Sequence, residues 1–180
     1  MKYILFLLSS VVLFSCGTEA KKQEETTSKA FYTLIETQED NLSKVAGNER
    51  KMAGVELINQ YKVFAEKFPQ DSATAEYLFR AGREEAFQGN FESSLRIYER
   101  ILKHYPDYIN AGNVAFMIAF TYDAHLGDFG KAQTAYSEFI EAYPDHRLVE
   151  DAKVSMEHLG LSDEDLLKKL QSQNSEEAES

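Results

Sequence analysis

The sequence predicts an all-α fold in which antiparallel helix hairpins stack into a solenoid. Three similar segments each end in an aromatic residue followed by proline, and they hold the chain's three prolines, Pro69, Pro106 and Pro144. The spacings of 37 and 38 residues between these prolines suit a helix hairpin with its turns and no strand period. Proline cannot continue a helix, so we expect each repeat unit to end there.

An apolar face precedes each proline. A tyrosine, an apolar residue and an aromatic residue recur at positions i, i+3 and i+7, a spacing that places all three on one side of a helix. The three sets are Tyr61, Phe64 and Phe68; Tyr98, Ile101 and Tyr105; Tyr136, Phe139 and Tyr143.

The first fifteen residues resemble an export signal. Lys2 precedes an apolar run over residues 3–14, which is shorter than the roughly 20 residues needed to span a bilayer. Leu13-Phe14-Ser15-Cys16 resembles the lipobox of bacterial lipoproteins, which implies cleavage after residue 15 and a diacylglyceryl group on Cys16. The alternative is an ordinary secreted protein with a free thiol at this position.

Residues 16–29 contain no aliphatic side chain larger than alanine and mix both charges, so we expect a flexible, lipidated tether. Gly17 directly follows the lipidated cysteine. In the resemblance to lipoproteins, the absence of aspartate at this position implies the outer membrane, and we expect the domain to face the periplasm.

The helical domain is expected over residues 30–172, with repeat units at about 31–69, 72–106 and 110–144. In the first unit, residues 51–68 form the clear second helix. Its partner over 31–47 has a weaker apolar stripe, consisting of Phe31, Leu34, Leu42 and Val45. In the later units, Gly89-Asn90-Phe91 and Gly127-Asp128-Phe129 each read as a helix stop, an N-cap and the first apolar residue of the next helix.

Capping helices are expected over residues 147–172. Asp145 is predicted to cap a helix over 147–159, which ends at Gly160. Ser162 is predicted to cap a last helix whose apolar face holds Leu166, Leu167 and Leu170. Residues 173–180 form an acidic polar tail that we expect to be disordered.

These motifs together resemble the tetratricopeptide repeat. The positions that carry the resemblance are Gly82, Gly89, Phe91, Ser94, Tyr98 and Pro106 in one unit, and Gly127, Phe129, Ala132, Tyr136 and Pro144 in the next. The second unit departs from the pattern with Phe120 at the position assigned to Gly82. The resemblance implies a right-handed α-solenoid of about seven or eight helices, similar to the tetratricopeptide lipoproteins of Gram-negative envelopes that act in outer-membrane assembly or coordinate cell division.

The sequence shows no pattern typical of an enzyme, such as a phosphate-binding loop or a nucleophile elbow. The four histidines (His104, His125, His146 and His158) occupy different phases of the repeat, so we expect no metal site. A formal charge of −11 disfavours nucleic acid as a partner. We therefore expect no catalytic residues and no cofactor beyond the lipid on Cys16.

The resemblance places a partner-binding groove on the inner face of the first helices. Its candidate residues are Phe79, Arg83, Phe87, Met117, Thr121 and Ala124. An amphipathic helix or an extended apolar segment suits this surface; alternatively, Phe79 and Phe87 pack against the N-terminal helices. The predicted function is a non-catalytic scaffold anchored in the outer membrane that binds other envelope proteins. The alternative function is a lipoprotein that binds a small molecule or glycan, and self-association through residues 31–47 is a third possibility.

Overall fold

The computed structural model describes residues 15–162, 164, 165, 167, 168 and 171, and for residues 15–26 it describes the backbone only. The predicted signal over residues 3–14, the side chains of Leu166 and Leu170, and the tail over residues 173–180 lie outside this part of the chain. The described residues form seven α-helices and one short π-helix, without a strand. The elements are α1 (Ser15–Lys44), α2 (Gly47–Lys67), α3 (Thr74–Phe87), α4 (Phe91–His104), α5 (Ala111–Phe120), η1 (Thr121–Leu126), α6 (Phe129–Ala142) and α7 (Val149–His158).

The chain divides into two compact units, one ending at Ala53 and the other beginning at Gly54. The first unit contains α1 and the start of α2. Helix α1 begins at Ser15, so residues 16–29 are helical where the sequence analysis expected a flexible tether. Alanine, lysine, glutamine and glutamate dominate this stretch, and their helix propensities favour a helix even without an apolar face to bury.

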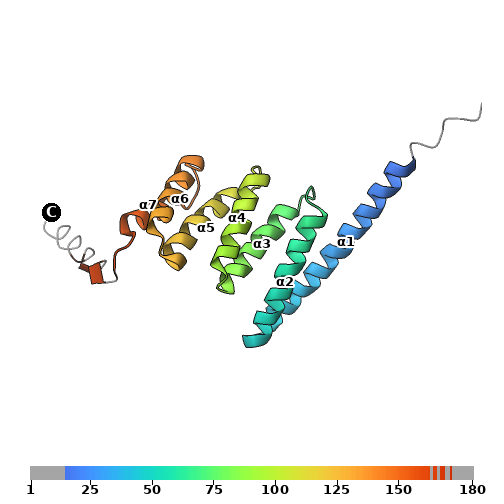
Figure 1. Ribbon diagram of the computed structural model, residues 1–180, viewed down its shortest axis with the longest axis horizontal. Coiled ribbons are helices and arrows are strands. Elements are labelled where there is room, and N and C mark those ends of the chain that lie inside the picture. Colours follow the sequence, from blue (N-terminus) through green and yellow to red (C-terminus); the bar gives the residue numbers. More distant parts are fainter. Residues whose placement is uncertain (1–14, 163, 166, 169–170, 172–180) are drawn as a thin grey trace, which may run out of the picture. The chain divides into compact units, whose positions relative to one another are not determined.

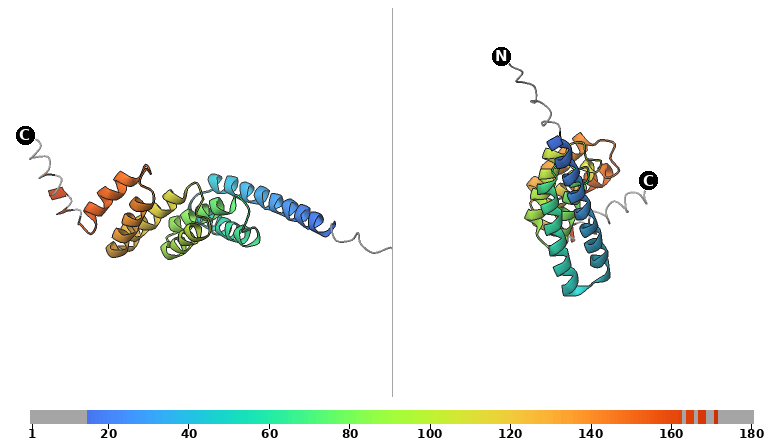
Figure 2. Two further views of the ribbon diagram at one scale, coloured as in Figure 1. Left: turned by 90° about the horizontal axis from the view of Figure 1, so that it is seen from above. Right: turned by 90° about the vertical axis from the view of Figure 1, so that its right-hand side faces the viewer.

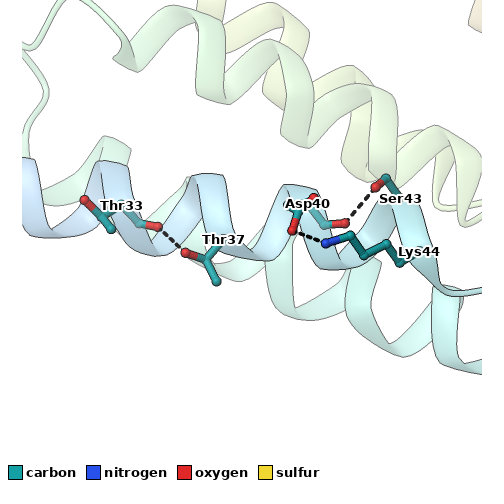
Figure 3. Close-up of polar contacts among 5 residues, drawn as sticks. All are labelled: Thr33, Thr37, Asp40, Ser43 and Lys44. Carbon is teal, nitrogen blue, oxygen red and sulfur yellow. Dashed lines mark hydrogen bonds and ion pairs between the residues drawn. The ribbon is translucent and has the colours of Figure 1, made fainter.

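Short local contacts run along the exposed side of α1 (Figure 3). The hydroxyl of Thr37 donates to the backbone oxygen of Thr33 over 2.7 Å. Lys44 pairs with the Asp40 carboxylate at 2.5 Å, one helical turn earlier. Such pairs support a solvent-exposed helix by a few tenths of a kcal/mol each, about 0.2–0.5.

The second unit consists of helix hairpins in which each helix runs antiparallel to the previous one (Figures 1 and 2). Helices α3 and α4 pack together as one hairpin, and α5 with η1 packs against α6 as the next. Helix α4 also contacts α5, and α6 contacts α7. The all-helical prediction is therefore confirmed.

The prolines and glycines of the second unit stand where the sequence analysis placed them. Helices α2, α4 and α6 each end two residues before a proline. Gly89 and Gly127 adopt left-handed conformations, with φ of 84° and 62°, which favour glycine. Asn90 and Asp128 follow them as N-cap residues of α4 and α6.

The start of α7 differs from the prediction. Asp145 does not cap this helix, because the chain makes one further turn after Pro144 in which His146 N donates to Tyr143 O. The N-cap residue is Leu148, and α7 begins at Val149. Gly160, with φ of 74°, follows the end of the helix as expected.

Candidate functional site

Each hairpin places a small residue of its first helix against a large aromatic residue of its second. Gly82 on α3 lies so close to Tyr98 on α4 that a methyl group on Gly82 would come within 2.4 Å of the ring. In the next hairpin, Ala119 on α5 is fully buried in the same cluster as Tyr136 on α6. These close approaches hold the two helices of each hairpin together.

Aromatic contacts show which positions of the two hairpins are equivalent. The ring of Phe79 lies 6.1 Å from the ring of Tyr98, and the ring of Phe116 lies 5.8 Å from that of Tyr136. Phe116 is therefore the counterpart of Phe79 in the next hairpin. The first half of α5 is offset from α3 by 37 residues.

The offset changes along the helix. Helix α3 starts at Thr74 and α5 at Ala111, 37 residues apart, whereas the left-handed glycines that close them, Gly89 and Gly127, are 38 apart. The segment formed by α5 and η1 thus holds one residue more than α3 does up to its closing glycine. The π-helix Thr121–Leu126 takes up that extra residue, because a π-helix is wider by about one residue per turn.

The extra residue corrects two sequence-based assignments. Ala119, rather than Phe120, stands at the position of Gly82, so the small residue typical of the repeat is present in both hairpins. Thr121 is completely buried, and its hydroxyl donates to the Met117 backbone oxygen over 2.6 Å. It therefore presents no side chain to a partner.

The six predicted groove residues differ in exposure. Phe79 is half-buried against Tyr98 and Tyr108, and the Arg83 guanidinium lies 5.9 Å from its ring centre. Phe87 is 68% exposed, Ala124 is exposed, and Met117 is half-buried. None of the six side chains lines the hollows described below.

A groove of about 830 Å³ lies between α4 and α6. Leu102 from α4, Ile118 from α5 and Ala135 from α6 give it an apolar lining. Tyr122 enters from the π-helix. The remaining lining residues are Glu99, Lys103, Asp128, Gly130, Lys131, Thr134 and Glu138. A smaller hollow of about 160 Å³ shares Leu102, Ile118, Ala135 and Glu138 and continues the apolar lining towards Phe139 and Tyr143.

Charges of both signs surround this groove. Asp128 pairs with Lys131 at 2.7 Å, and a side-chain hydrogen bond from this lysine, joined by one from its backbone, lowers the pKa of the Asp128 carboxyl. The Lys131 ammonium also lies 5.2 Å from the centre of the Tyr122 ring. Glu99 and Glu138, by contrast, form no ion pair with any residue in the described part of the chain.

This groove lies between the second helices of two hairpins, whereas the sequence predicted a binding surface on the first helices. The sequence does carry a signal for the groove, which appears when each residue of α4 is compared with the residue 38 positions later on α6. Ile97 and Arg100 on α4 correspond to Ala135 and Glu138 on α6. The loss of bulk at both positions marks the site.

A second hollow, of about 530 Å³, lies between the turn that follows α2 and the turn that follows α4. The Tyr108 hydroxyl donates to the Glu76 carboxylate over 2.5 Å, and the Tyr105 hydroxyl donates to the Pro69 backbone oxygen over 3.1 Å. Burial, and then the bond to Glu76, raise the pKa of Tyr108. These internal bonds join successive turns, so this hollow has a structural explanation.

Comparison with known families identifies the repeats. The sequence model of the tetratricopeptide repeat matches residues 76–108 and 114–146, which correspond to the two central hairpins. No curated protein gives a match. The two hairpins are therefore tetratricopeptide repeats, and repeats of this class typically bind other proteins.

Two further properties bear on function. Among the described helices, none combines the length and the apolar character that crossing a membrane requires. The part of the chain that the structure describes also contains no group of three or more histidine, cysteine, aspartate or glutamate residues arranged to hold a metal ion.

Proposed function

We propose that this chain is a lipid-anchored tetratricopeptide scaffold that holds a partner protein at the cell envelope and has no catalytic role. The observation that carries the proposal is the groove between α4 and α6, which opens an apolar lining to solvent inside a repeat array of a protein-binding class. Binding energy at protein interfaces is concentrated in such apolar pockets.

The N-terminal sequence supports the anchor. The apolar run over residues 3–14 followed by Cys16 is typical of bacterial lipoproteins, and Gly17 favours the outer membrane. Helix α1 makes the segment that follows the lipidated cysteine longer than a flexible chain of the same sequence would be on average. A helix of 30 residues is about 45 Å long, more than twice the mean span of a flexible chain over residues 17–29.

Two measurements test this proposal. The full chain, expressed in a Gram-negative host, should incorporate labelled palmitate and fractionate with the outer membrane, whereas Cys16→Ser should do neither. The tagged wild-type protein, purified from gently solubilised envelopes, should carry a defined protein in near-stoichiometric amount. A labelled Cys16→Ser variant would contradict the anchor, and a wild-type protein that never carries a partner would contradict the scaffold.

A second candidate function rests on the size of the groove. Its volume falls within the range of small-molecule sites, about 300–1,000 Å³, and charged groups converge on an apolar lining. A lipoprotein that captures a small apolar ligand is therefore the alternative. Mass spectrometry of ligands extracted from the purified protein distinguishes the two, because a scaffold should carry no ligand at one-to-one stoichiometry.

A further inference from the structure

Successive junctions between second helices are filled differently. At the junction of α2 and α4, Arg100 donates a hydrogen bond from Nη2 to the Ala65 backbone oxygen over 3.3 Å. Ile97, one turn earlier on α4, is only 7% exposed. Arg100 therefore bridges the two helices, and Ile97 is the buried residue one turn before it on α4.

The next junction, between α4 and α6, lacks both groups. Ala135 stands where the first junction has Ile97, and Glu138 stands where it has Arg100. The smaller alanine leaves space, and a carboxylate cannot donate to a backbone oxygen as a guanidinium does. The groove of about 830 Å³ lies at this position, with Ala135 and Glu138 in its lining. Two residue differences therefore account for a groove at one junction and bridging at the other.

Two carboxylates border the groove from opposite sides. Glu99 belongs to α4 and Glu138 to α6, and neither has an ion-pair partner among the described residues. Asp128 and Lys131 neutralise each other at one end. Lys103 is the remaining cation of the lining, so one negative charge is left over. The chain as a whole carries −11, which adds attraction for a basic partner.

We propose that this groove binds an amphipathic helix of a partner protein, with an apolar stripe seated on Leu102, Ile118 and Ala135 and a lysine or arginine placed between Glu99 and Glu138. The inference rests on the proposed scaffold function and names the chemistry of its partner. Helix-in-groove recognition places apolar anchors at i, i+3 or i+4, and i+7.

The dimensions of the groove suit such a ligand. Its lining on α6 extends from Asp128 to Glu138, which corresponds to about 15 Å along a helix. About ten residues of a bound helix span that length, enough for three anchors on one face. The smaller adjoining hollow near Phe139 and Tyr143 offers room for an anchor beyond the third.

The test uses the first junction as a template for closing the second. Ala135→Ile with Glu138→Arg installs in α6 the two residues that α4 already holds at the equivalent positions. The double variant should therefore fold, and circular dichroism with thermal unfolding will verify this. Glu141→Arg makes the same charge change on an exposed α6 residue outside the groove and serves as the matched control.

The probe is a display library of random peptides of about twelve residues, long enough to span the groove as a helix. Peptides selected on the full wild-type chain should show apolar residues at helical spacing and a net positive charge. Synthetic copies should bind the double variant at least tenfold more weakly than the wild-type chain or Glu141→Arg. A copy whose basic residues are replaced by glutamate should bind Glu138→Arg more tightly than wild type.

Several results would overturn the proposal. Selected peptides without a positive bias would contradict the charge preference of the groove. Peptides that bind the double variant as tightly as the wild-type chain would show that they do not bind in the groove. Tighter peptide binding after deletion of residues 161–180 would assign the groove to the chain's own C-terminal segment instead. A dimer in sedimentation analysis that the double variant dissociates would assign it to a second copy.

Failure of this inference is distinguishable from failure of the scaffold function. A partner that co-purifies equally with the wild-type chain and the double variant would keep the scaffold and reject this groove. If no partner co-purifies but the peptides are selected as expected, the groove binds basic amphipathic helices and the proposed scaffold role at the envelope is wrong.

Discussion

Lys62 on α2 donates a hydrogen bond to the buried carboxylate of Glu85 on α3, and this ion pair joins one repeat to the next. Ser93 and Asn90 donate to the same carboxylate over 2.8 Å each. Burial opposes ionisation of Glu85, but the hydrogen bonds from Lys62, Ser93 and Asn90 outweigh it and lower its pKa below the ordinary value of 4.5.

The lowered pKa predicts a dependence of stability on pH. A carboxyl with a lower pKa in the folded state stabilises the fold fully above its ordinary pKa, and this contribution is lost as pH falls through the folded pKa. We expect the free energy of unfolding of the wild-type chain to decrease as the pH is lowered below about 4.5. Glu85→Gln should cost about 1–3 kcal/mol at pH 7 and flatten the acid limb in urea titrations. An unchanged acid limb would show that other carboxylates govern it, and Glu138→Gln is the exposed control.

Gly82 and Gly130 offer a matched pair of substitutions. A methyl group at Gly82 would collide with the fully buried ring of Tyr98, whereas at Gly130 the nearest atom, Asp128 Oδ1, lies 3.9 Å away. Overpacking of this kind costs about 1–3 kcal/mol, and alanine in a helix is favoured over glycine by up to about 1 kcal/mol. Thermal unfolding should therefore show Gly82→Ala destabilised and Gly130→Ala equal to or above wild type. Equal melting temperatures would contradict the close approach.

The two junctions between second helices should respond oppositely to exchange of their residues. Ile97→Ala removes three buried carbon atoms and should cost about 2–4 kcal/mol. Ala135→Ile adds the same atoms to an open groove and should stay within about 1.5 kcal/mol of wild type. Urea unfolding of the two single variants measures both values. A large penalty for Ala135→Ile would mean that the groove cannot accommodate an aliphatic side chain.

Deletion of Thr121 should be tolerated, because α5 and η1 together hold one residue more than α3, and the π-helix takes up that surplus residue. The shortened helix can continue from Phe120 to Tyr122 in α-helical geometry, as α3 does from Arg83 to Glu84. Deletion of Arg83 has no such surplus to absorb it and rotates the rest of α3 by about 100°. Circular dichroism and thermal melts should show cooperative unfolding for the Thr121 deletion only. Cooperative unfolding of both deletions would show that α3 also adapts its register.

Much of the fold follows from residues with strong local preferences. The prolines and left-handed glycines, such as Pro106 and Gly127, mark the ends of helices through backbone geometry that holds in any context. The start of α1 could not be read from apolar patterning, because propensity alone supports that helix. The register beyond Phe120 was also hidden, since a π-helix leaves no signature in the spacing of apolar residues.

The site was less predictable than the fold. A groove forms where side chains are missing, so it depends on Ala135 and Glu138 being smaller or differently charged than Ile97 and Arg100. Neither residue attracts notice by itself. Only the superposition of successive hairpins shows that the first junction is filled and the second is open.

The surplus residue in the π-helix bears on how such repeats diverge. Because the irregularity is confined to Thr121–Leu126, a chain can gain or lose a codon there while both ends of the hairpin keep their partners. Homologues of different length at this point could therefore share one architecture. An alignment that opened the gap in the turn before α5 would displace Phe120 and its neighbours by one position and pair buried residues with exposed ones.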